Sequence, residues 1–233
     1  MLVNAVLKVV LVDVNADVVR AWRSAFSDLA EVSVVHGSIL DQRTDAWVTP
    51  TNARGSMDGG GDAVIKRHLG ASIEKKVQKA IRAQYKGVMP VGSATCVPTG
   101  VAVPRYLIST PTMLASAEDV SETMNVALAC AAAFQMIHQQ NAKEPGSITS
   151  VALPGLGART GGVPAEKCAD LMWAGYHLFR EYRFRDFSTM RAALMEQLAD
   201  LTPRFGSARQ KYELPEPIII ETEPAPWTFL SKK

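Results

Sequence analysis

Apolar, β-branched runs alternate with helix-periodic segments along most of this chain, and this alternation limits the possible folds more than any other feature. The runs predicted to be strands are residues 5–14, 32–36, 45–50, 93–97, 106–110 and 150–153. Helices are predicted at residues 18–26, 63–68, 73–85, 120–139 and 165–183. Strands separated by helices pair in parallel through crossovers that cover both faces of the sheet. The sequence therefore predicts a layered α/β domain.

The composition is typical of a soluble globular protein, with 47% hydrophobic and 21% charged residues. A formal net charge of +2 provides no strong attraction to nucleic acid or anionic lipid. Cys96, Cys130 and Cys168 form no CxxC pair, which argues against a structural zinc site and a disulfide framework. We therefore expect a reducing, cytoplasmic compartment, and we expect neither a membrane span nor a signal peptide from the apolar runs.

The composition changes after about Phe187, where proline becomes frequent. With 233 residues, one domain with an appendage is the natural expectation. We predict a domain over residues 1–186 and an appendage over residues 187–233, made of a helix at 189–201 and an extended, Pro-rich tail.

Two predicted strands run into loops that are unusually rich in glycine. The first loop spans residues 49–62 and contains three consecutive glycines; the second spans residues 155–162 and contains Arg159. In open α/β sheets, ligands bind beyond the carboxyl ends of the strands. Unpaired backbone N–H groups in such loops and at helix N-termini favour the binding of anions. Two such loops that face one crevice suit a diphosphate. The alternative for either loop alone is a tight strand–helix connection that needs positive φ.

Asp62 and Asn52 are the polar candidates of the first loop. Asp62 either caps the following helix or lies beside a ligand as an ionised carboxylate. In the second case the helix N-terminus would lower its pKa and make it a weak general base. Asn52 either contacts ribose hydroxyls through its amide or serves as a turn residue before Gly55. The histidines have no metal-ligand spacing, and no GxSxG elbow supports a serine hydrolase.

A dinucleotide- or methyl-donor-binding enzyme is a lesser alternative. An acidic strand end at Asp13 precedes a helix, and the spacing from Gly155 to Gly161 is close to a dinucleotide fingerprint. However, no glycine-rich turn precedes Asp13, and the glycine loop follows the last strand rather than the first.

The run from Asn52 through residues 59–70 combines a strand end, a glycine cluster, an aspartate and a helix ending in glycine. This run resembles the macro domain signature, and the segments at residues 36–39 and 154–164 follow the family's order. The resemblance spans about residues 1–185, and the chain is similar to macro domains of bacterial and phage genomes. It implies a three-layer α–β–α sandwich with a mixed, mostly parallel sheet that binds ADP-ribose in a crevice.

The resemblance also implies the residues of the site. It assigns catalysis to Asp62 and Asn52, with Asn52 on the distal ribose. The implied ligand-binding residues are Ser38, Ile39, Asn52, Gly59, Gly60, Gly61, Asp62, Gly155, Gly157, Ala158, Arg159, Thr160 and Gly161. Ser38 and Ile39 are expected near adenine, and residues 157–161 around the diphosphate.

Three positions depart from the family's pattern. Ser38 stands where many macro domains have an Asp that reads the adenine amino group, and Thr49 replaces the first of two Asn residues. Arg159 stands where typical members have small residues. Serine can still bond to adenine but offers no charge-assisted acceptor, so the departure at Ser38 affects the affinity for the ligand or the choice of base. The Lys and Asp pair of the lyase-like hydrolytic branch and the paired Glu of the poly(ADP-ribose) glycohydrolases have no match.

These observations predict a protein that binds ADP-ribose or an ADP-ribosylated macromolecule and removes ADP-ribose hydrolytically, without a metal or cofactor. One alternative is a reader module that binds ADP-ribose or a related nucleotide without turnover. Another is a structural or phage-associated protein whose crevice is vestigial. The sequence supports no prediction of the oligomeric state.

Overall fold

The structure, a computed structural model, describes residues 6–199 and 223–224 and contains a six-stranded sheet. Its strands are β1 (Lys8–Asp13), β2 (Val32–His36), β3 (Ala46–Thr49), β4 (Thr95–Pro98), β5 (Tyr106–Ser109) and β6 (Ser150–Leu153). Their order across the sheet is β2-β1-β6-β3-β5-β4, and every neighbouring pair is parallel except β4 with β5. The prediction of a mixed, mostly parallel sheet is confirmed. The carboxyl ends of the five parallel strands therefore meet at one edge.

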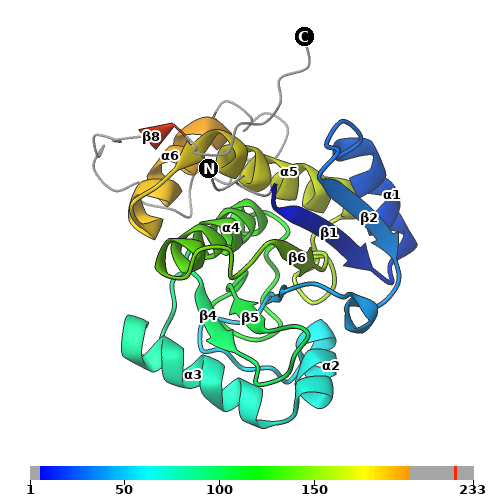
Figure 1. Cartoon of the computed structure of the whole chain (residues 1–233). Coiled ribbons are helices and arrows are strands. Elements are labelled where there is room, and N and C mark those ends of the chain that lie inside the picture. The colour runs from blue at the N-terminus through cyan, green and yellow to red at the C-terminus, as the bar shows by residue number, and fades with distance from the viewer. Residues whose placement is uncertain (1–5, 200–222, 225–233) are drawn as a thin grey trace.

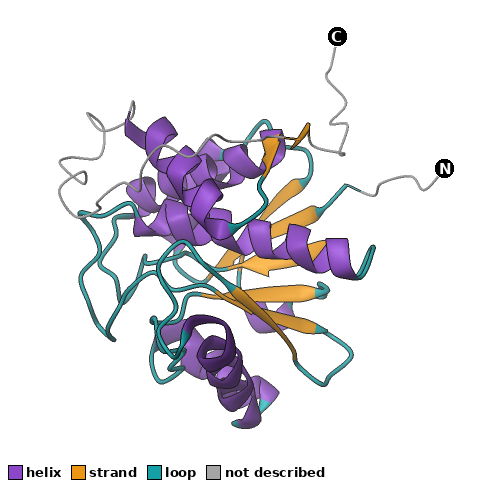
Figure 2. Cartoon of the chain, turned by 90° about the vertical axis from the view of Figure 1, so that its left-hand side faces the viewer, coloured by secondary structure: helices purple, strands orange, loops and turns teal. Residues whose placement is uncertain are grey.

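Helices cover both faces of this sheet (Figures 1 and 2). One layer consists of α1 (Ala16–Ala25), α4 (Asn125–Lys143), α5 (Ala165–Glu181) and α6 (Phe187–Ala199), and the other of α2 (Gly60–Leu69) and α3 (Ser72–Tyr85). Each layer encloses its own hydrophobic cluster against the sheet. The predicted three-layer α–β–α sandwich is confirmed.

Local sequence explains several of these elements directly. The side chain of Asn15 accepts a hydrogen bond from the Asp17 amide and so caps α1. In α3, Ile73, Val77 and Ile81 recur every fourth residue and are all buried against the sheet, as the periodicity predicts. All four residues of β3 are buried, because this strand lies in the middle of the sheet with helices on both sides.

Helix α4 begins at Asn125 rather than at Val120, the predicted start. The Val120 amide donates to the Gly161 carbonyl at 2.9 Å, and the Thr123 hydroxyl donates to the Val120 carbonyl at 2.8 Å. These bonds hold residues 120–124 in a turn, although Val120 and Met124 are buried like helix residues. The predicted helix included this turn because the segment contains neither proline nor glycine, and the turn packs against the core as the helix does.

Helix α6 joins the same core as α4 and α5. Met190, Leu194 and Leu198 are buried in the hydrophobic cluster that these helices share. The short strand β7 (Tyr182–Arg183) pairs antiparallel with β8 (Glu223–Pro224). The rest of the predicted extended tail lies outside the described residues.

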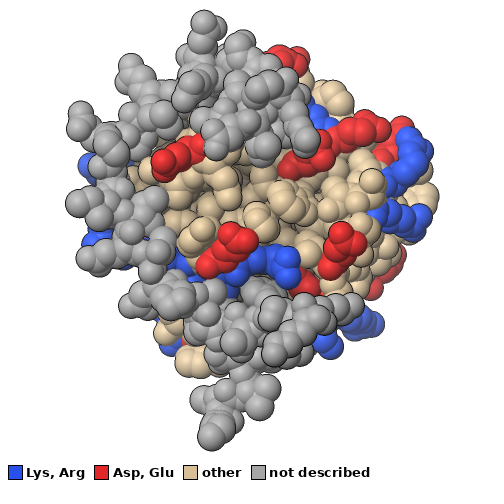
Figure 3. Space-filling view, turned by 90° about the horizontal axis from the view of Figure 1, so that it is seen from above, with Lys and Arg blue, Asp and Glu red and all other residues tan. Residues whose placement is uncertain are grey.

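The outer face seen in Figure 3 carries interspersed acidic and basic side chains over its described part, rather than an area of one sign. Among the helices of the described residues, none is long and apolar enough to cross a membrane.

We expect Gly175→Ala to lower the free energy of unfolding by about 2 kcal/mol or more, because α5 touches α4 at this residue. A Cβ there would lie 2.6 Å from the Ala127 carbonyl oxygen and 2.9 Å from the Ala131 amide nitrogen. Both atoms belong to the backbone of α4 and cannot rotate away. Urea denaturation measures the loss. A variant as stable as the wild-type chain would show that the two helices are not packed this closely.

Candidate functional site

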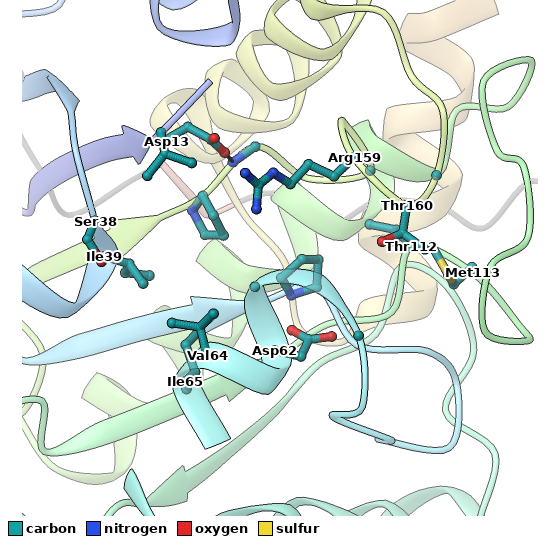
Figure 4. A pocket seen from close by; sticks show the side chains of 18 of the residues that line it. Asp13, Ser38, Ile39, Asp62, Val64, Ile65, Thr112, Met113, Arg159 and Thr160 are labelled. Atoms are coloured by element: carbon teal, nitrogen blue, oxygen red, sulfur yellow. Dashed lines mark hydrogen bonds between the residues drawn. The ribbon is translucent and has the colours of Figure 1, made fainter. Parts of the chain in front are cut away.

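A cavity of about 140 Å³ opens at the edge of the sheet where the parallel strands end (Figure 4). Its lining comes from the ends of β1, β3 and β6, the turn after β2, the first turns of α2 and the loop after β6. The lining residues are Asp13, Val14, Gly37, Ser38, Ile39, Pro50, Gly59, Gly61, Asp62, Val64, Ile65, Thr112, Met113, Pro154, Gly155, Gly157, Arg159, Thr160 and Gly161. The two glycine-rich loops of the sequence therefore face the same cavity.

The loop after β6 is shaped by glycines whose neighbours leave no room for a side chain. A Cβ on Gly161 would lie 2.7 Å from a Val120 methyl carbon and 2.8 Å from the Gly157 carbonyl oxygen. Gly157 itself has a φ of 71°, which favours glycine. The loop is further held by the Gly155 amide, which donates to an Asp13 carboxylate oxygen at 3.0 Å.

The first loop enters α2 without a side-chain cap. Gly59 occupies the N-cap position and makes no capping bond, so Gly60, Gly61 and Asp62 form the first turn of the helix. The interpretation of Asp62 as the cap is therefore wrong. A Cβ on Gly60 would lie 3.4 Å from the Thr160 hydroxyl oxygen, which shows how closely the two glycine segments approach each other. An uncapped helix N-terminus beside a glycine loop is a favourable place for an anion.

The carboxyl group of Asp62 lies on the cavity wall and accepts a hydrogen bond from the Thr49 hydroxyl. Burial raises the pKa of Asp62 to about 6, although the hydrogen bond from Thr49 acts in the opposite direction. The prediction that the helix N-terminus lowers this pKa is thus wrong, because desolvation of the charged form outweighs it. A carboxyl group with a pKa near neutrality is suited to accept a proton at physiological pH.

We expect Asp62→Asn to be more stable than the wild-type chain at neutral pH and equally stable at about pH 4. In the folded protein Asp62 keeps its proton up to about pH 6, whereas an unfolded Asp loses it near about pH 3.9. The wild-type chain therefore loses stability as the pH rises through this window, by up to about 3 kcal/mol at about 1.4 kcal/mol per pKa unit. The amide has no charge to bury.

Denaturant unfolding across this pH range measures the difference. The matched control is Asp28→Asn, at an exposed position after α1, which should change the free energy of unfolding by no more than about 0.5 kcal/mol. A stability difference for Asp62→Asn that is constant with pH would contradict the raised pKa.

Most of the predicted site residues line the cavity, but three do not. Asn52, Gly60 and Ala158 are absent from the lining. The Asn52 side-chain oxygen accepts from the amides of Arg54 and Ser56, and its nitrogen donates to the Ser116 hydroxyl at 2.8 Å. In this structure Asn52 thus fastens two loops together, and its predicted contact with a ribose stays a prediction.

Sequence reasoning missed several lining residues, above all Asp13, Thr112 and Met113. Asp13 ends β1, and its carboxylate reaches the second glycine loop because β1 lies beside β6. The signal available in the sequence was an acidic residue at a strand end, which was assigned to the dinucleotide-binding alternative. Thr112 and Met113 follow β5, and Met113 bridges to Asn52.

Arg159 is exposed at the rim of the cavity. Figure 4 shows its side chain turned from the second loop toward the space between Asp13 and Asp62. Within residues 6–199 no ion pair engages its guanidinium group. A cation with free donors is therefore available to an anionic ligand.

The fold and cavity define an α/β domain with a crevice at the carboxyl ends of its strands, the position where such sheets bind ligands. The family model for the Macro domain matches residues 48–172, more than half of the chain. The chain belongs to this family. The predicted resemblance is confirmed, and the dinucleotide-fold alternative is wrong.

The chain is also similar to several other proteins. An uncharacterized protein of Aquifex aeolicus is 37% identical over 142 residues, which cover 61% of this chain and 78% of that protein. The macrodomain of Mycobacterium tuberculosis DarG is 25% identical with a TM-score of 0.51, and the match covers 60% of this chain and 86% of that one. The macrodomain of Oceanobacillus iheyensis solved with ADP shares the fold at 17% identity and a TM-score of 0.50, over 71% of this chain and 90% of that one.

Proposed function

We propose that this protein binds ADP-ribose in the cavity between its two glycine-rich segments and hydrolyses ADP-ribosyl adducts. The observation that carries the proposal is the meeting of these segments around one cavity that also contains the Asp62 carboxyl group. Family membership adds support, because the macrodomain of Oceanobacillus iheyensis, which has the same fold, is solved with ADP.

The binding half of the proposal rests on main-chain donors. The uncapped first turn of α2 and the loop after β6 both line the cavity. The Gly155 amide already donates to Asp13, so the main-chain donors that we assign to the ligand are those of the α2 turn and of residues 157–161. A diphosphate carries charge on two neighbouring phosphoryl groups and can use donors on both sides. Arg159 adds a cation with unengaged donors at the rim.

The hydrolytic half rests on Asp62. In the proposed reaction a water oxygen bonds to the anomeric carbon of the distal ribose, and Asp62 accepts the proton of that water. The bond from the anomeric carbon to the modified group breaks, and the leaving group takes the electron pair and then the proton that Asp62 accepted from the water. A pKa of about 6 allows Asp62 to be a carboxylate at neutral pH while remaining basic enough for this role. The cavity walls hold the ribose near this carboxylate, which supplies orientation.

Thr49 and Asn52 support the site from outside in this proposal. The Thr49 hydroxyl holds the Asp62 carboxylate in one orientation. The Asn52 side chain fixes the loop that leads to α2 through the amides of Arg54 and Ser56.

The test is a calorimetric titration with ADP-ribose beside ADP, AMP and NAD, followed by assay of ADP-ribose release from mono-ADP-ribosylated proteins. We expect ADP-ribose and ADP to bind and AMP to bind more weakly, because AMP lacks the second phosphoryl group. Release of ADP-ribose from a modified substrate would support the proposed hydrolysis. Binding without release would favour the alternative, a reader module that binds ADP-ribose without turnover. No heat and no thermal shift at millimolar ADP-ribose would refute both and favour a vestigial crevice, since saturating ligand should add about 2.7 kcal/mol at 100 times its Kd.

A further inference from the structure

The glycine turn that opens α2 has no side chains of its own to hold it in place. Gly59, Gly60 and Gly61 are exposed, and a Cβ built on Gly59 or Gly61 meets no atom within 4 Å. Glycine also has the widest conformational freedom of any residue. Apart from the bond between Thr49 and Asp62, the position of this turn therefore depends on the segments on either side of it.

One carboxylate, that of Glu74 in the first turn of α3, is bonded to the segments on both sides of the glycine turn. Its Oε1 accepts a hydrogen bond from the Met57 amide at 2.8 Å, two residues before Gly59. Its Oε2 pairs with the Lys66 Nζ at 2.6 Å, in the second half of α2. The side chain of Glu74 is only 16% exposed, so both bonds are largely shielded from water, where such bonds are stronger.

The segment before the glycine turn takes its position from α3. Gly55 packs so closely on this helix that a Cβ there would lie 2.7 Å from an Ile81 methyl carbon. The Met57 side chain is fully buried in the cluster between the sheet and this layer. Only Asp58 lies between Met57 and the glycines. The bond from the Met57 amide to Glu74 is therefore the last fixed point before the turn.

We propose that Glu74 is a positioning residue that holds the glycine turn of α2, and with it the Asp62 carboxyl group, in place through the Met57 amide. The inference rests on the proposed function, in which this turn supplies phosphate donors and the general base. Without Glu74 the half-buried Met57 amide loses its acceptor, which is unfavourable, so the loop moves to satisfy it. The ion pair is secondary, because Lys66 also pairs with the exposed Asp58 at 2.9 Å.

Three substitutions separate the hydrogen bond of Glu74 from its charge. Glu74→Gln keeps an oxygen acceptor for the amide without the charge, Glu74→Asp keeps the charge on a side chain one methylene shorter, and Glu74→Ala removes both. The readout is the pH titration of the Asp62 carboxyl carbon by NMR, with Asp62→Asn to identify its resonance. This readout needs no ligand and no turnover.

We expect the Asp62 titration midpoint at about 6 in the wild-type chain and in Glu74→Gln, because burial, and not the charge of Glu74, raises this pKa. In Glu74→Asp and Glu74→Ala the midpoint should fall by at least about one pH unit, because a displaced turn admits water to the carboxyl group. The other charged side chains of the cavity wall, Asp13 and Arg159, are the same in every variant.

Calorimetry with ADP gives the second readout. We expect the affinity to fall about tenfold in Glu74→Asp and Glu74→Ala, because displaced main-chain donors no longer meet both phosphoryl groups. Glu74→Gln should bind within about threefold of the wild-type chain. The matched control is Glu166→Ala, a glutamate in the first turn of α5 that does not line the cavity. It should match the wild-type chain in both measurements.

An Asp62 midpoint that is the same in every Glu74 variant would overturn the inference. A midpoint lowered in Glu74→Gln as much as in Glu74→Ala would also overturn it, because the charge and not the hydrogen bond would then be responsible. If Glu74→Ala does not fold, the comparison of Glu74→Gln with Glu74→Asp still decides. If the wild-type chain does not bind ADP although the titrations follow the expected pattern, the proposed function fails and the position of the turn stands as inferred.

Discussion

Asp62→Ala is expected to reduce ADP-ribose release at least about 100-fold, the lower end of what a positioned general base contributes. The Kd for ADP-ribose should change by less than about tenfold, because the phosphate donors are main-chain amides that the substitution leaves in place. The loss should therefore appear in kcat rather than in ligand affinity. Single-turnover assays with a mono-ADP-ribosylated protein, beside calorimetry with ADP-ribose, measure the two quantities separately.

Asp58→Ala is the matched control for this variant. Asp58 belongs to the same loop, is exposed and bonds to Lys66 at 2.9 Å, and it does not line the cavity. Its removal should leave both turnover and binding unchanged within about twofold. Equal activity of the wild-type chain and Asp62→Ala would remove Asp62 from the chemistry.

The pH dependence of the proposed hydrolysis by the wild-type chain provides a second check on Asp62. A general base acts only when it is deprotonated, so kcat/KM should rise with pH through about 6, the pKa of Asp62 in the folded protein. A rate that falls as the pH increases through this value would indicate that Asp62 is needed in its protonated form.

Gly61→Val is expected to weaken ADP-ribose binding at least about 100-fold without unfolding the protein. Gly61 lies in the first turn of α2 and lines the cavity, and a Cβ built there meets no atom within 4 Å. The open space around it is the space that we assign to the ligand. A branched side chain would fill that space, and the helix itself gains a few tenths of a kcal/mol because valine is a better helix former than glycine.

Thermal unfolding and calorimetry together test this prediction. The control is Arg67→Ala, an exposed position on the same helix that does not line the cavity, and it should bind ADP-ribose like the wild-type chain. Normal ADP-ribose binding by Gly61→Val would place the ligand somewhere other than this cavity. A lower melting temperature would instead show that the α2 turn does not tolerate a side chain.

The sequence alone determined the elements and the glycine-rich segments of the site. The strand β2 (Val32–His36) and the strand β6 (Ser150–Leu153) have the predicted bounds, because short β-branched runs bounded by turn residues are a local signal. The two glycine-rich loops could also be identified from the sequence. Consecutive glycines cost conformational entropy, and a fold tolerates that cost where the backbone must closely approach a ligand or another segment. From these features the sequence also yielded the family, which the match over residues 48–172 confirms.

Only the tertiary structure decided what the polar side chains do. Asp62 has a raised pKa because packing removes water from its carboxyl group. The residues next to Asp62 in the sequence do not indicate that it is buried. Asn52 is engaged by Ser116, and Asp13 reaches Gly155 because β1 is placed beside β6, more than a hundred residues later in the chain. Local patterns specify elements because propensity and periodicity act over a few residues, whereas strand order and desolvation depend on contacts between distant segments.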